Sequence, residues 1–335
     1  MIAGQIESDA EPVADVAAHL GWPLFAEPLS GLRRPGVLSA GQALLMDERF
    51  AEQHAADVVL QFGRTPTSRP TQRFVGAAAR LAVIGEQPAD PKGAVHAVSA
   101  PEGAAARALI KLVSEGGEGT WLKEWADADA VARKALDAFL DAEKQPLELR
   151  IARDVAAALP AGTTLVVASS TPVRDLDLAM APRDGLRVIA NRGASGIDGF
   201  VSTVLGVASS GVPTVALAGD LSLLHDASGL VWGARRGESV TFVVLNNAGG
   251  GIFDLLPSAA LPENDALFAT AHEIDLRALA AAAGIGHETG PDPTAFLAEE
   301  PKASRIFEVP IDRTRAVKRR KALKKAIGAA LSAAG

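Results

Sequence analysis

The sequence predicts an α/β fold with two domains, each built on a parallel sheet flanked by helices. Short apolar runs rich in aliphatic and β-branched side chains alternate with longer helical patterns. Runs of about four to eight such residues are typical of parallel strands that are buried on both faces. The chain has 335 residues, 48% of them hydrophobic. Because a single core usually stops growing at about 250–300 residues, this length favours two domains.

A series of apolar runs marks the expected strands. In the first third of the chain they read VVLQFG, RLAVIGE and AVHAVSA, and the opening MIAGQ is also strand-like. In the remainder they read TTLVVASS, LRVIAN, PTVALAGD, TFVVLNN and RIFEVPID. Between the two sets, a polar Gly/Glu turn leads into a charged amphipathic helix without a strand. We therefore place the domain boundary near Gln145, which gives domains 1–145 and 146–335.

Charge and composition exclude several classes of function. The chain has 33 basic and 40 acidic residues, a net charge of -7, which argues against a general nucleic-acid binder. It has no cysteine, so a disulfide framework, a thiolate metal site and a cysteine nucleophile are excluded, and a reducing cytoplasm is the expected location. The start of the sequence lacks the pattern of a secretory signal. The long uncharged stretch 199–219 contains a proline and several glycines, so we expect a helix, a turn and a buried strand rather than a membrane span.

Polar residues follow two of the expected strands. The run LAGDLSLL leads into Gly219 and Asp220, and TFVVLNNAGGGIF leads into Asn246 and Asn247. Both positions fall at carboxyl ends of parallel strands, where open α/β sheets bind their ligands. Aspartate and asparagine offer hard oxygen donors, and the glycines beyond them let a main-chain carbonyl approach. This donor set suits Mg²⁺ held together with a diphosphate.

A second glycine-rich stretch, NRGASGIDGF, resembles an anion-binding turn, although its spacing differs from that of dinucleotide-binding loops. Gly193, Gly196 and Gly199 would allow close approach of the main chain to a ligand. A helix expected to begin near Ile197 would direct its positive N-terminus at an anion. Arg192 in the same stretch supplies a cation.

Three motifs together identify a family. Gly219-Asp220, followed about two dozen residues later by Asn246-Asn247, resembles the diphosphate-binding signature of thiamine diphosphate enzymes. The stretches NRGASGIDG, GDLSLLHD and NNAGGGIFDLLP occur in the order found in the 2-succinyl-5-enolpyruvyl-6-hydroxy-3-cyclohexene-1-carboxylate synthase (MenD) family of menaquinone biosynthesis. The resemblance extends from about Leu24 to the C-terminal helix. It implies a thiamine diphosphate-binding fold preceded by a middle domain.

The resemblance also implies roles for single residues at the cofactor. Asp220, Asn247 and the carbonyl of Gly249 would bind Mg²⁺, or Mn²⁺ in its place. Ile252 would be an apolar wedge that holds thiamine diphosphate bent, although a plain core isoleucine is the alternative. The remaining expected cofactor contacts are Leu221, Ser222 and Gly250.

The family substrates, 2-oxoglutarate and isochorismate, are both dianions, so the resemblance implies a cationic substrate site. Arginine suits bidentate binding of carboxylates. Arg69 stands where the family often has a lysine from the middle domain, with an ordinary surface arginine as the alternative. The other expected substrate contacts are Ser170, Arg174, Arg192, Ile252, Phe253 and Leu256. No zinc site is expected, and for His225 we expect a structural hydrogen-bonding role.

Members of this family have three domains, and this sequence begins like their middle domain. We therefore expect the N-terminal pyrimidine-binding domain to be absent, and with it the glutamate that activates the cofactor. No catalytic residue is assigned; Glu27 lies in a superficially similar context but has no motif support. The expectations are a truncated chain that is inactive alone, exposed apolar surface and homo-oligomers. The alternatives are a non-catalytic thiamine diphosphate or carboxylate-binding module, or another thiamine diphosphate carboligase.

Overall fold

The structure, a computed structural model, describes residues 1–86, 88, 96–116 and 119–334. The chain forms two compact units, each discontinuous in sequence. The first unit contains Met1–Asp141, Asp177–Asp184 and Ala322–Gly335, and the second contains Ala142–Leu176 and Gly185–Lys321. The sequence predicts continuous domains 1–145 and 146–335, whereas residues 177–184 and 322–335 group with the first unit. The roles of the two parts as middle and diphosphate-binding domains stay predictions.

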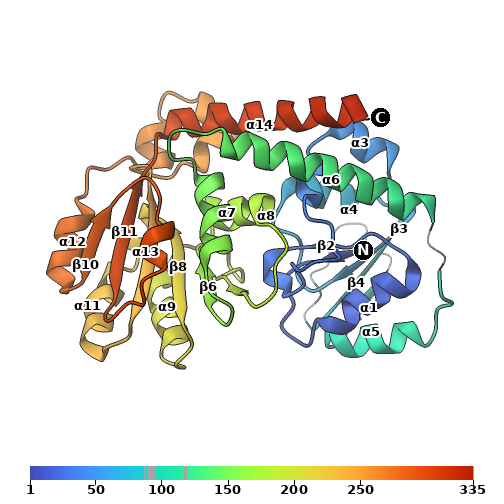
Figure 1. Cartoon of the computed structure of the whole chain (residues 1–335), viewed down its shortest axis with the longest axis horizontal. Helices are drawn as coiled ribbons and strands as arrows, with labels where there is room; N and C mark the ends of the chain where they lie inside the picture. The colour runs from blue at the N-terminus through green and yellow to red at the C-terminus, as the bar shows by residue number, and fades with distance from the viewer. Residues whose placement is uncertain (87, 89–95, 117–118, 335) are drawn as a thin grey trace. The chain divides into compact units, whose positions relative to one another are not determined.

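The first unit is built on a five-stranded parallel sheet (Figure 1). Its strand order is β2-β1-β3-β4-β5. The strands are β1 (Ile2–Ala3), β2 (Phe25–Ala26), β3 (Val58–Phe62), β4 (Arg80–Gly85) and β5 (His96–Ser99). The helices are α1 (Glu11–Leu20), α2 (Gly41–Leu45), α3 (Glu48–Gln53), α4 (Arg69–Gly76), α5 (Glu102–Ile110) and α6 (Thr120–Asp141), with the 3-10 turn η1 (Pro28–Ser30). α1 and α5 pack on one face of the sheet through an apolar cluster that includes Val13, Val16 and Ala106.

An aromatic cluster forms a second packing centre in the first unit. Trp125 of α6 is fully buried and meets the rings of Phe25, Phe50 and Phe74 edge to face, with centroids 4.9 to 5.8 Å apart. Such contacts add to the free energy of burying the rings. The long helix α6 is therefore anchored by one large side chain.

The second unit is built on a six-stranded parallel sheet in the order β10-β11-β9-β8-β6-β7. The strands are β6 (Thr164–Val167), β7 (Arg187–Ile189), β8 (Thr214–Gly219), β9 (Val240–Asn246), β10 (Gly286–Thr289) and β11 (Arg305–Pro310). The helices are α7 (Glu148–Ala158), α8 (Thr171–Ala179), α9 (Phe200–Ala208), α10 (Asp220–Leu224), α11 (Ala227–Arg236), α12 (Leu276–Ala283), α13 (Thr294–Leu297) and α14 (Arg313–Ala334). The short turns η2 (Phe253–Leu255), η3 (Pro257–Ala260) and η4 (Asn264–Ala269) follow β9. Parts of α8 and α14 belong to the first unit.

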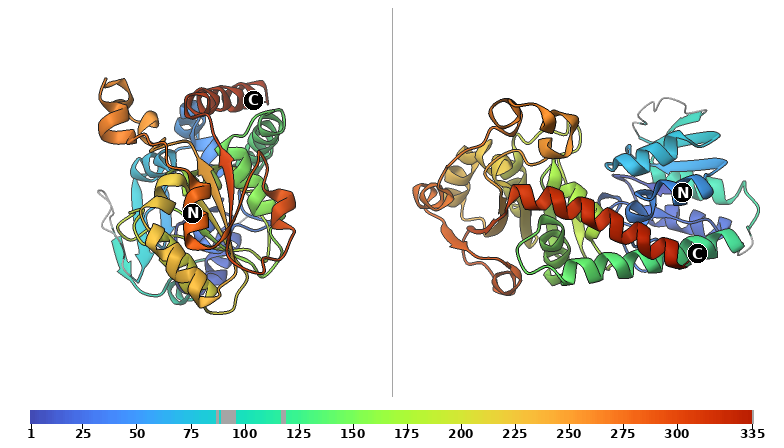
Figure 2. Two further views of the ribbon diagram at one scale, coloured as in Figure 1. Left: turned by 90° about the vertical axis from the view of Figure 1, so that its left-hand side faces the viewer. Right: turned by 90° about the horizontal axis from the view of Figure 1, so that it is seen from above.

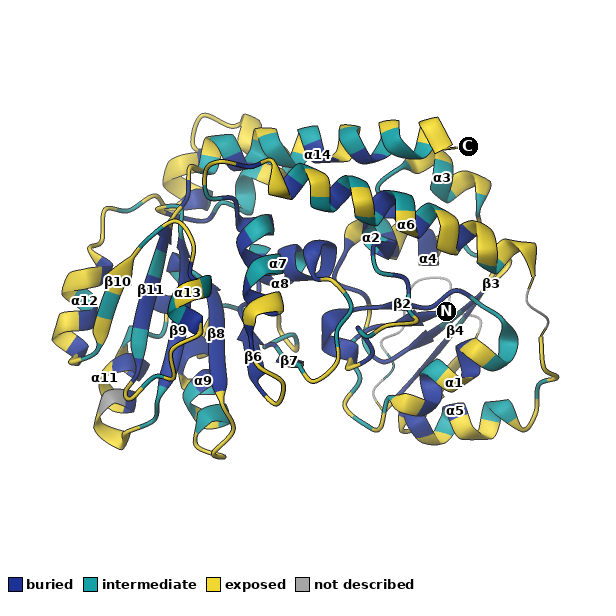
Figure 3. Cartoon of the chain, viewed as in Figure 1, coloured by how far each residue is buried: buried dark blue, intermediate teal, exposed yellow. Residues whose placement is uncertain are grey.

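The core of the second unit explains its apolar strands. α9, α11 and α12 contribute Phe200, Leu230 and Leu276 to one cluster that also contains Phe242 of β9. The central strands β6, β8 and β9 are buried along almost their whole length (Figure 3). This is the burial pattern of parallel strands covered on both faces. Figure 2 shows the same layers from two further directions.

The predicted α/β fold class is confirmed. Every apolar run named above contains a strand, although Ala94 and Val95 of AVHAVSA lie outside the described residues. Two strands were not expected from the sequence: β2 has only two residues, and β10 consists of the polar stretch GHET. Among the described residues, no helix is both long enough and apolar enough to cross a bilayer.

Local sequence signals set several helix ends. The carboxylates of Asp47 and Asp275 and the hydroxyl of Ser68 accept hydrogen bonds from main-chain N–H groups in the first turns of α3, α12 and α4. Such caps satisfy donors that have no partner within the helix. At the other end, Gly21 and Gly284 adopt left-handed conformations that end α1 and α12.

Candidate cofactor and metal site

The site begins with two paired strands. β8 and β9 are parallel neighbours, and their register places Gly219 opposite Leu245. Asp220, directly after β8, and Asn247, directly after β9, therefore emerge at the same edge of the sheet. The sequence predicts this juxtaposition, and both side chains line one pocket.

Asp220 is almost completely buried, with 1% of its surface exposed. Its Oδ1 accepts a hydrogen bond from the main-chain N–H of Leu221 at 2.9 Å, and its Oδ2 accepts one from Gly249 at 2.8 Å. Nε2 of His272 lies 3.1 Å from the same Oδ2. Burial raises the pKa of Asp220, while these hydrogen bonds and the nearby imidazole oppose that rise. The carboxylate is thus fixed in place before any ligand arrives.

The loop after β9 has an unusual backbone. Ala248 has φ +57° and Gly249 has φ +148°. A Cβ on Gly249 would lie 2.6 Å from the carbonyl oxygen of Ala269, so this position requires glycine. A non-glycine residue at positive φ stores strain, which is found most often at functional sites.

Asn247 carries an oxygen without a partner. Its Oδ1 is buried and accepts no hydrogen bond. A buried acceptor left unpaired costs free energy and calls for an explanation such as a bound ion. Among the described residues, no three histidine, aspartate or glutamate side chains gather as a metal site. A cation here would need amide and main-chain oxygens beside Asp220, which is the donor set that Mg²⁺ accepts.

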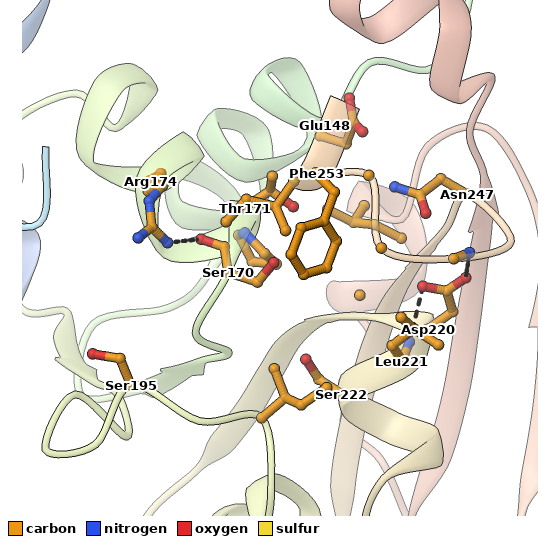
Figure 4. Close-up of a pocket in the computed structure, with 18 of the residues that line it drawn as sticks. Glu148, Ser170, Thr171, Arg174, Ser195, Asp220, Leu221, Ser222, Asn247 and Phe253 are labelled. Atoms are coloured by element: carbon orange, nitrogen blue, oxygen red, sulfur yellow. Dashed lines mark hydrogen bonds between the residues drawn. The ribbon is translucent and has the colours of Figure 1, made fainter. Parts of the chain in front are cut away.

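The pocket has a volume of about 390 Å³, and all of its lining residues lie in the second unit. It contains eleven of the thirteen positions named from the sequence. These are Ser170, Arg174, Asp220, Leu221, Ser222, Asn247, Gly249, Gly250, Ile252, Phe253 and Leu256. Figure 4 labels several of them, among them Asp220 and Asn247. Residues separated by up to 86 positions in sequence, from 170 to 256, thus come together around one cavity.

Ser170 and Arg174 lie at the start of α8, across the pocket from Asn247 (Figure 4). Ser170 has φ +81°, another strained non-glycine position. Its carbonyl accepts a hydrogen bond from Nη1 of Arg174. The guanidinium of Arg174 therefore lies beside the N-terminus of α8, where it forms part of the pocket wall.

Two expected substrate residues do not line this pocket. Arg192 is half-buried in the turn after β7, and Arg69 is an exposed residue at the start of α4 in the first unit. Their roles in substrate binding stay predictions. Glu27 is buried in the first unit, where its Oε1 accepts a hydrogen bond from the N–H of Thr67 at 2.5 Å.

The glycine-rich stretch differs from expectation in one respect. Helix α9 begins at Phe200 rather than near Ile197, because Gly199 adopts φ +64°, which lies outside the helical region. The N–H of Ser202 in its first turn donates to the carboxylate of Asp226 at 2.6 Å. The predicted start of the helix is therefore wrong by three residues. The anion-binding role of this turn stays a prediction. The loop residues 195–198 do line the pocket.

Sequence reasoning missed three residues of this region. Glu148, the first residue of α7, lines the pocket and is 4% exposed. His272 contacts Asp220, although it stands in no ligand-like spacing. Arg313, at the start of α14, pairs through Nε with Asp254 at 2.9 Å. Each lies far from the motifs in sequence, so only the fold shows the contact.

Arg313 and Asp254 fix the loop that carries the pocket's apolar wall. Asp254 also accepts a hydrogen bond from Nδ2 of Asn264 at 2.8 Å, and Arg313 makes a further ion pair with Asp265. The segment after Asn247 is therefore tied to η4 and to α14. This network holds Ile252 and Phe253, at the start of the short turn η2, beside the cavity.

Comparison with known proteins supports the resemblance seen in the motifs. Residues 180–304 match the family described as thiamine pyrophosphate enzyme, C-terminal TPP binding domain. The 2-succinyl-5-enolpyruvyl-6-hydroxy-3-cyclohexene-1-carboxylate synthase of Thermobifida fusca (strain YX) is 39% identical over 99% of this chain and 60% of its own length. The chain is thus similar to this synthase along almost the whole of its own length.

Other synthases of the same description extend this relationship. That of Myxococcus xanthus (strain DK1622) is 38% identical over 84% of this chain, and that of Chloroflexus aurantiacus is 40% identical over 82%. The chain covers 50% and 49% of these two proteins. It thus spans about half the length of the curated relatives that it matches. The predicted resemblance to the synthase family is confirmed, and the matched thiamine pyrophosphate-binding region contains Asp220, Asn247 and Gly249.

Proposed function

We propose that this chain binds thiamine diphosphate and a divalent cation, Mg²⁺ or Mn²⁺, in the pocket at the ends of β8 and β9. The observation that carries the proposal is the buried, unpartnered Oδ1 of Asn247 beside the preorganised carboxylate of Asp220. In this proposal Asp220, Asn247 and the carbonyl of Gly249 hold the cation. Leu221, Ser222, Gly250 and Ile252 contact the cofactor.

We further propose that the protein takes part in the reaction of its relatives, with 2-oxoglutarate and isochorismate as substrates. Bound thiamine diphosphate supplies an electron sink for decarboxylation of a 2-oxo acid. Arg174 would orient a substrate carboxylate, with Arg69 and Arg192 as further cationic contacts. Ser170 would donate a hydrogen bond, and Ile252, Phe253 and Leu256 would exclude water from the apolar side.

Calorimetry tests the binding proposal. The Asp220→Ala variant should lose Mg²⁺-dependent binding of thiamine diphosphate by 100-fold or more, because it removes the charged ligand. Asp275→Ala is a matched control: this carboxylate also accepts two main-chain hydrogen bonds in the second unit, but it does not line the pocket. Asp275→Ala should cost about 1 kcal/mol of stability through the lost cap and leave the affinity unchanged. Equal affinity of Asp220→Ala and wild type would refute the proposal.

Release of carbon dioxide tests the catalytic part. The protein as its source cell makes it should release carbon dioxide from 2-oxoglutarate, and faster when isochorismate is present to accept the product. Binding of thiamine diphosphate without turnover would favour the non-catalytic binding module. A preference for pyruvate would favour another thiamine diphosphate carboligase.

We also propose a homo-oligomer in the cytoplasm. Its support is exposed apolar surface in the second unit, where Trp232 is 62% and Leu267 70% exposed, since such surface is usually covered by a partner. A chain without cysteine suits a reducing compartment. A monomer by light scattering at high concentration would contradict the first proposal, and cell fractionation tests the second.

A further inference from the structure

Glu148 has no role in the site described so far, yet it is one of the most buried charged residues in the second unit. It opens α7, lines the pocket and is 4% exposed. One of its carboxylate oxygens, Oε2, is buried without a hydrogen-bond partner. Burying a carboxylate without a partner costs free energy, so a neighbouring group is expected to interact with it.

That neighbour is Asn247. The side chains of Asn247 and Glu148 line the same pocket, and the nitrogen of the Asn247 amide is the end that faces Glu148 (Figure 4). An ionised carboxylate can only accept, whereas the amide of asparagine has one donating and one accepting end. The Nδ2 group of Asn247 therefore faces Glu148, and its Oδ1 points elsewhere. That Oδ1 is the buried oxygen without a partner.

The main chain supports the same orientation. A Cβ on Gly251 would lie 2.6 Å from Nδ2 of Asn247, so the glycine leaves the space that the amide nitrogen occupies. The Asn247 amide is thus confined by Gly251 on one side and faces Glu148. These two contacts restrict rotation of the amide.

Glu148 is in turn balanced by a buried cation. Nη2 of Arg320 in α14 lies 3.9 Å from Oε2 of Glu148. Arg320 is itself held by Asp175, a fully buried carboxylate whose Oδ2 accepts a hydrogen bond from Nη2 at 2.8 Å. This Asp175–Arg320–Glu148 chain leads from α8 through α14 to the pocket.

We propose that Glu148 is a positioning residue that orients the amide of Asn247, so that its oxygen faces the divalent cation, and that Arg320 keeps Glu148 in place. The inference rests on the proposed function, since it concerns the same cation. It adds an anionic residue that never touches the metal or the cofactor. Replacing a residue that contacts a metal ligand typically lowers the metal affinity by about 10- to 100-fold.

A change of donor and acceptor between the two residues tests the contact. Mn²⁺ is titrated in the presence of saturating thiamine diphosphate, by calorimetry, in the protein as its source cell makes it. Glu148→Gln should weaken Mn²⁺ binding by tenfold or more. The glutamine amide can donate as well as accept, so it no longer restricts Asn247 to the orientation in which Nδ2 faces position 148. In the Asn247→Asp background the same Glu148→Gln change should cause no loss, because the glutamine amide can donate to the new carboxylate.

A control variant separates positioning from general loss of a buried charge. Glu143 is also 4% exposed and pairs with Arg315 and Arg319, but it does not line the pocket. Glu143→Gln should lower the melting temperature and leave the Mn²⁺ affinity within about twofold of wild type. The melting temperature of each variant without metal reports whether it is folded.

The outcomes are distinct. A loss on Glu148→Gln that is equal in both backgrounds would overturn the inference in favour of a simple charge effect. No loss in either background would overturn it as well, while Mn²⁺ and cofactor binding by the wild type would leave the proposed function intact. A wild-type protein that binds neither would overturn the proposed function and this inference together.

Discussion

Both units contain a parallel sheet, but the residues that follow the carboxyl ends of the strands differ between them. We call the first unit's edge closed and the second unit's edge open. In the first unit, the chain continues from β1 and β3 through Gly4 and Gly63, and main chain packs directly on main chain. A Cβ on Gly4 would lie 2.0 Å from the carbonyl oxygen of Arg64. The cavity at this edge is only about 30 Å³. In the second unit, Asp220 and Asn247 follow the strands, and the cavity is about 390 Å³.

The comparison shows that the sheet alone does not make a site. Both edges collect strand ends, as open α/β sheets do. Glycines with no space for a side chain close one edge. At the other edge, main-chain hydrogen bonds hold the buried carboxylate of Asp220 beside a cavity. The difference thus lies in a few residues just beyond each strand.

The largest expected effect comes from breaking the closed edge. Gly63 has φ +74°, and its Cβ would lie 2.2 Å from the carbonyl oxygen of Gln5. Gly63→Ala should lower the free energy of unfolding by about 3–5 kcal/mol, because backbone strain and a steric clash add. Gly31, with φ +76° and no atom within 4 Å of its Cβ position, is the matched control and should lose only about 1–2 kcal/mol. Urea unfolding measures both, and equal losses would show that the edge is not tightly closed.

A second prediction concerns Asp177, a buried carboxylate of the first unit. Burial raises the pKa of Asp177 from 3.8 to about 6, against the opposing charge of Arg33. The folded state therefore binds this proton more tightly than the unfolded chain does. The contribution of Asp177 to stability is complete below pH 3.8 and is lost as the pH rises through about 6.

The Asp177→Asn variant isolates this contribution. The free energy of unfolding of wild type minus that of the variant should fall between pH 4 and pH 7 by at most about 3 kcal/mol, at ~1.4 kcal/mol per pKa unit. Urea unfolding at several pH values measures this difference. A difference that is constant with pH, or that rises, would contradict the assignment.

Much of the fold and the centre of the site follow from the sequence, for physical reasons. The apolar runs predict β6, β8 and β9 because strands buried on both faces leave little choice of residue. Asp220 and Asn247 directly follow such strands, so their proximity can be inferred without coordinates. β10 was missed because GHET is a polar strand at the edge of the sheet, where one neighbour alone supplies the hydrogen bonds.

The supporting residues could not be inferred in the same way. Glu148 opens a helix, where an acidic residue is ordinary, and Arg313 and Arg320 stand in a basic helix that resembles a solvated surface element. Their contacts depend on how α7 and α14 pack, which no local pattern encodes. The start of α9 was misplaced because Gly199 was interpreted only as a site of close approach, whereas its left-handed φ excludes it from the helix.

A smaller effect is expected at the apolar wall of the open edge. Ile252→Ala should weaken thiamine diphosphate binding by about tenfold, close to 1.4 kcal/mol, because it would remove the apolar contact with the cofactor that the proposed function assigns to Ile252. Leu255→Ala is the control, since Leu255 is 41% exposed and does not line the pocket. Calorimetry with Mg²⁺ present compares the two. Equal affinities would mean that Ile252 is only a packing residue.

The smallest expected effect is relief of strain in the open edge. Ala248 has φ +57°, a conformation that glycine adopts freely. Ala248→Gly should therefore raise the free energy of unfolding without ligands by about 0.5–1 kcal/mol. Thermal unfolding without metal measures this change. A destabilised variant would show that the loop is not strained at this residue.

The register between β8 and β9 has a consequence for how this region can vary. Because Gly219 lies opposite Leu245, the separation of Asp220 and Asn247 is set by the spacing of neighbouring strands, not by the number of residues between them. The turn before β9, around Gly237, lies at the amino ends of the strands, away from the pocket. Insertions and deletions in that turn should therefore be tolerated, and the chain can change length there while the site keeps its dimensions.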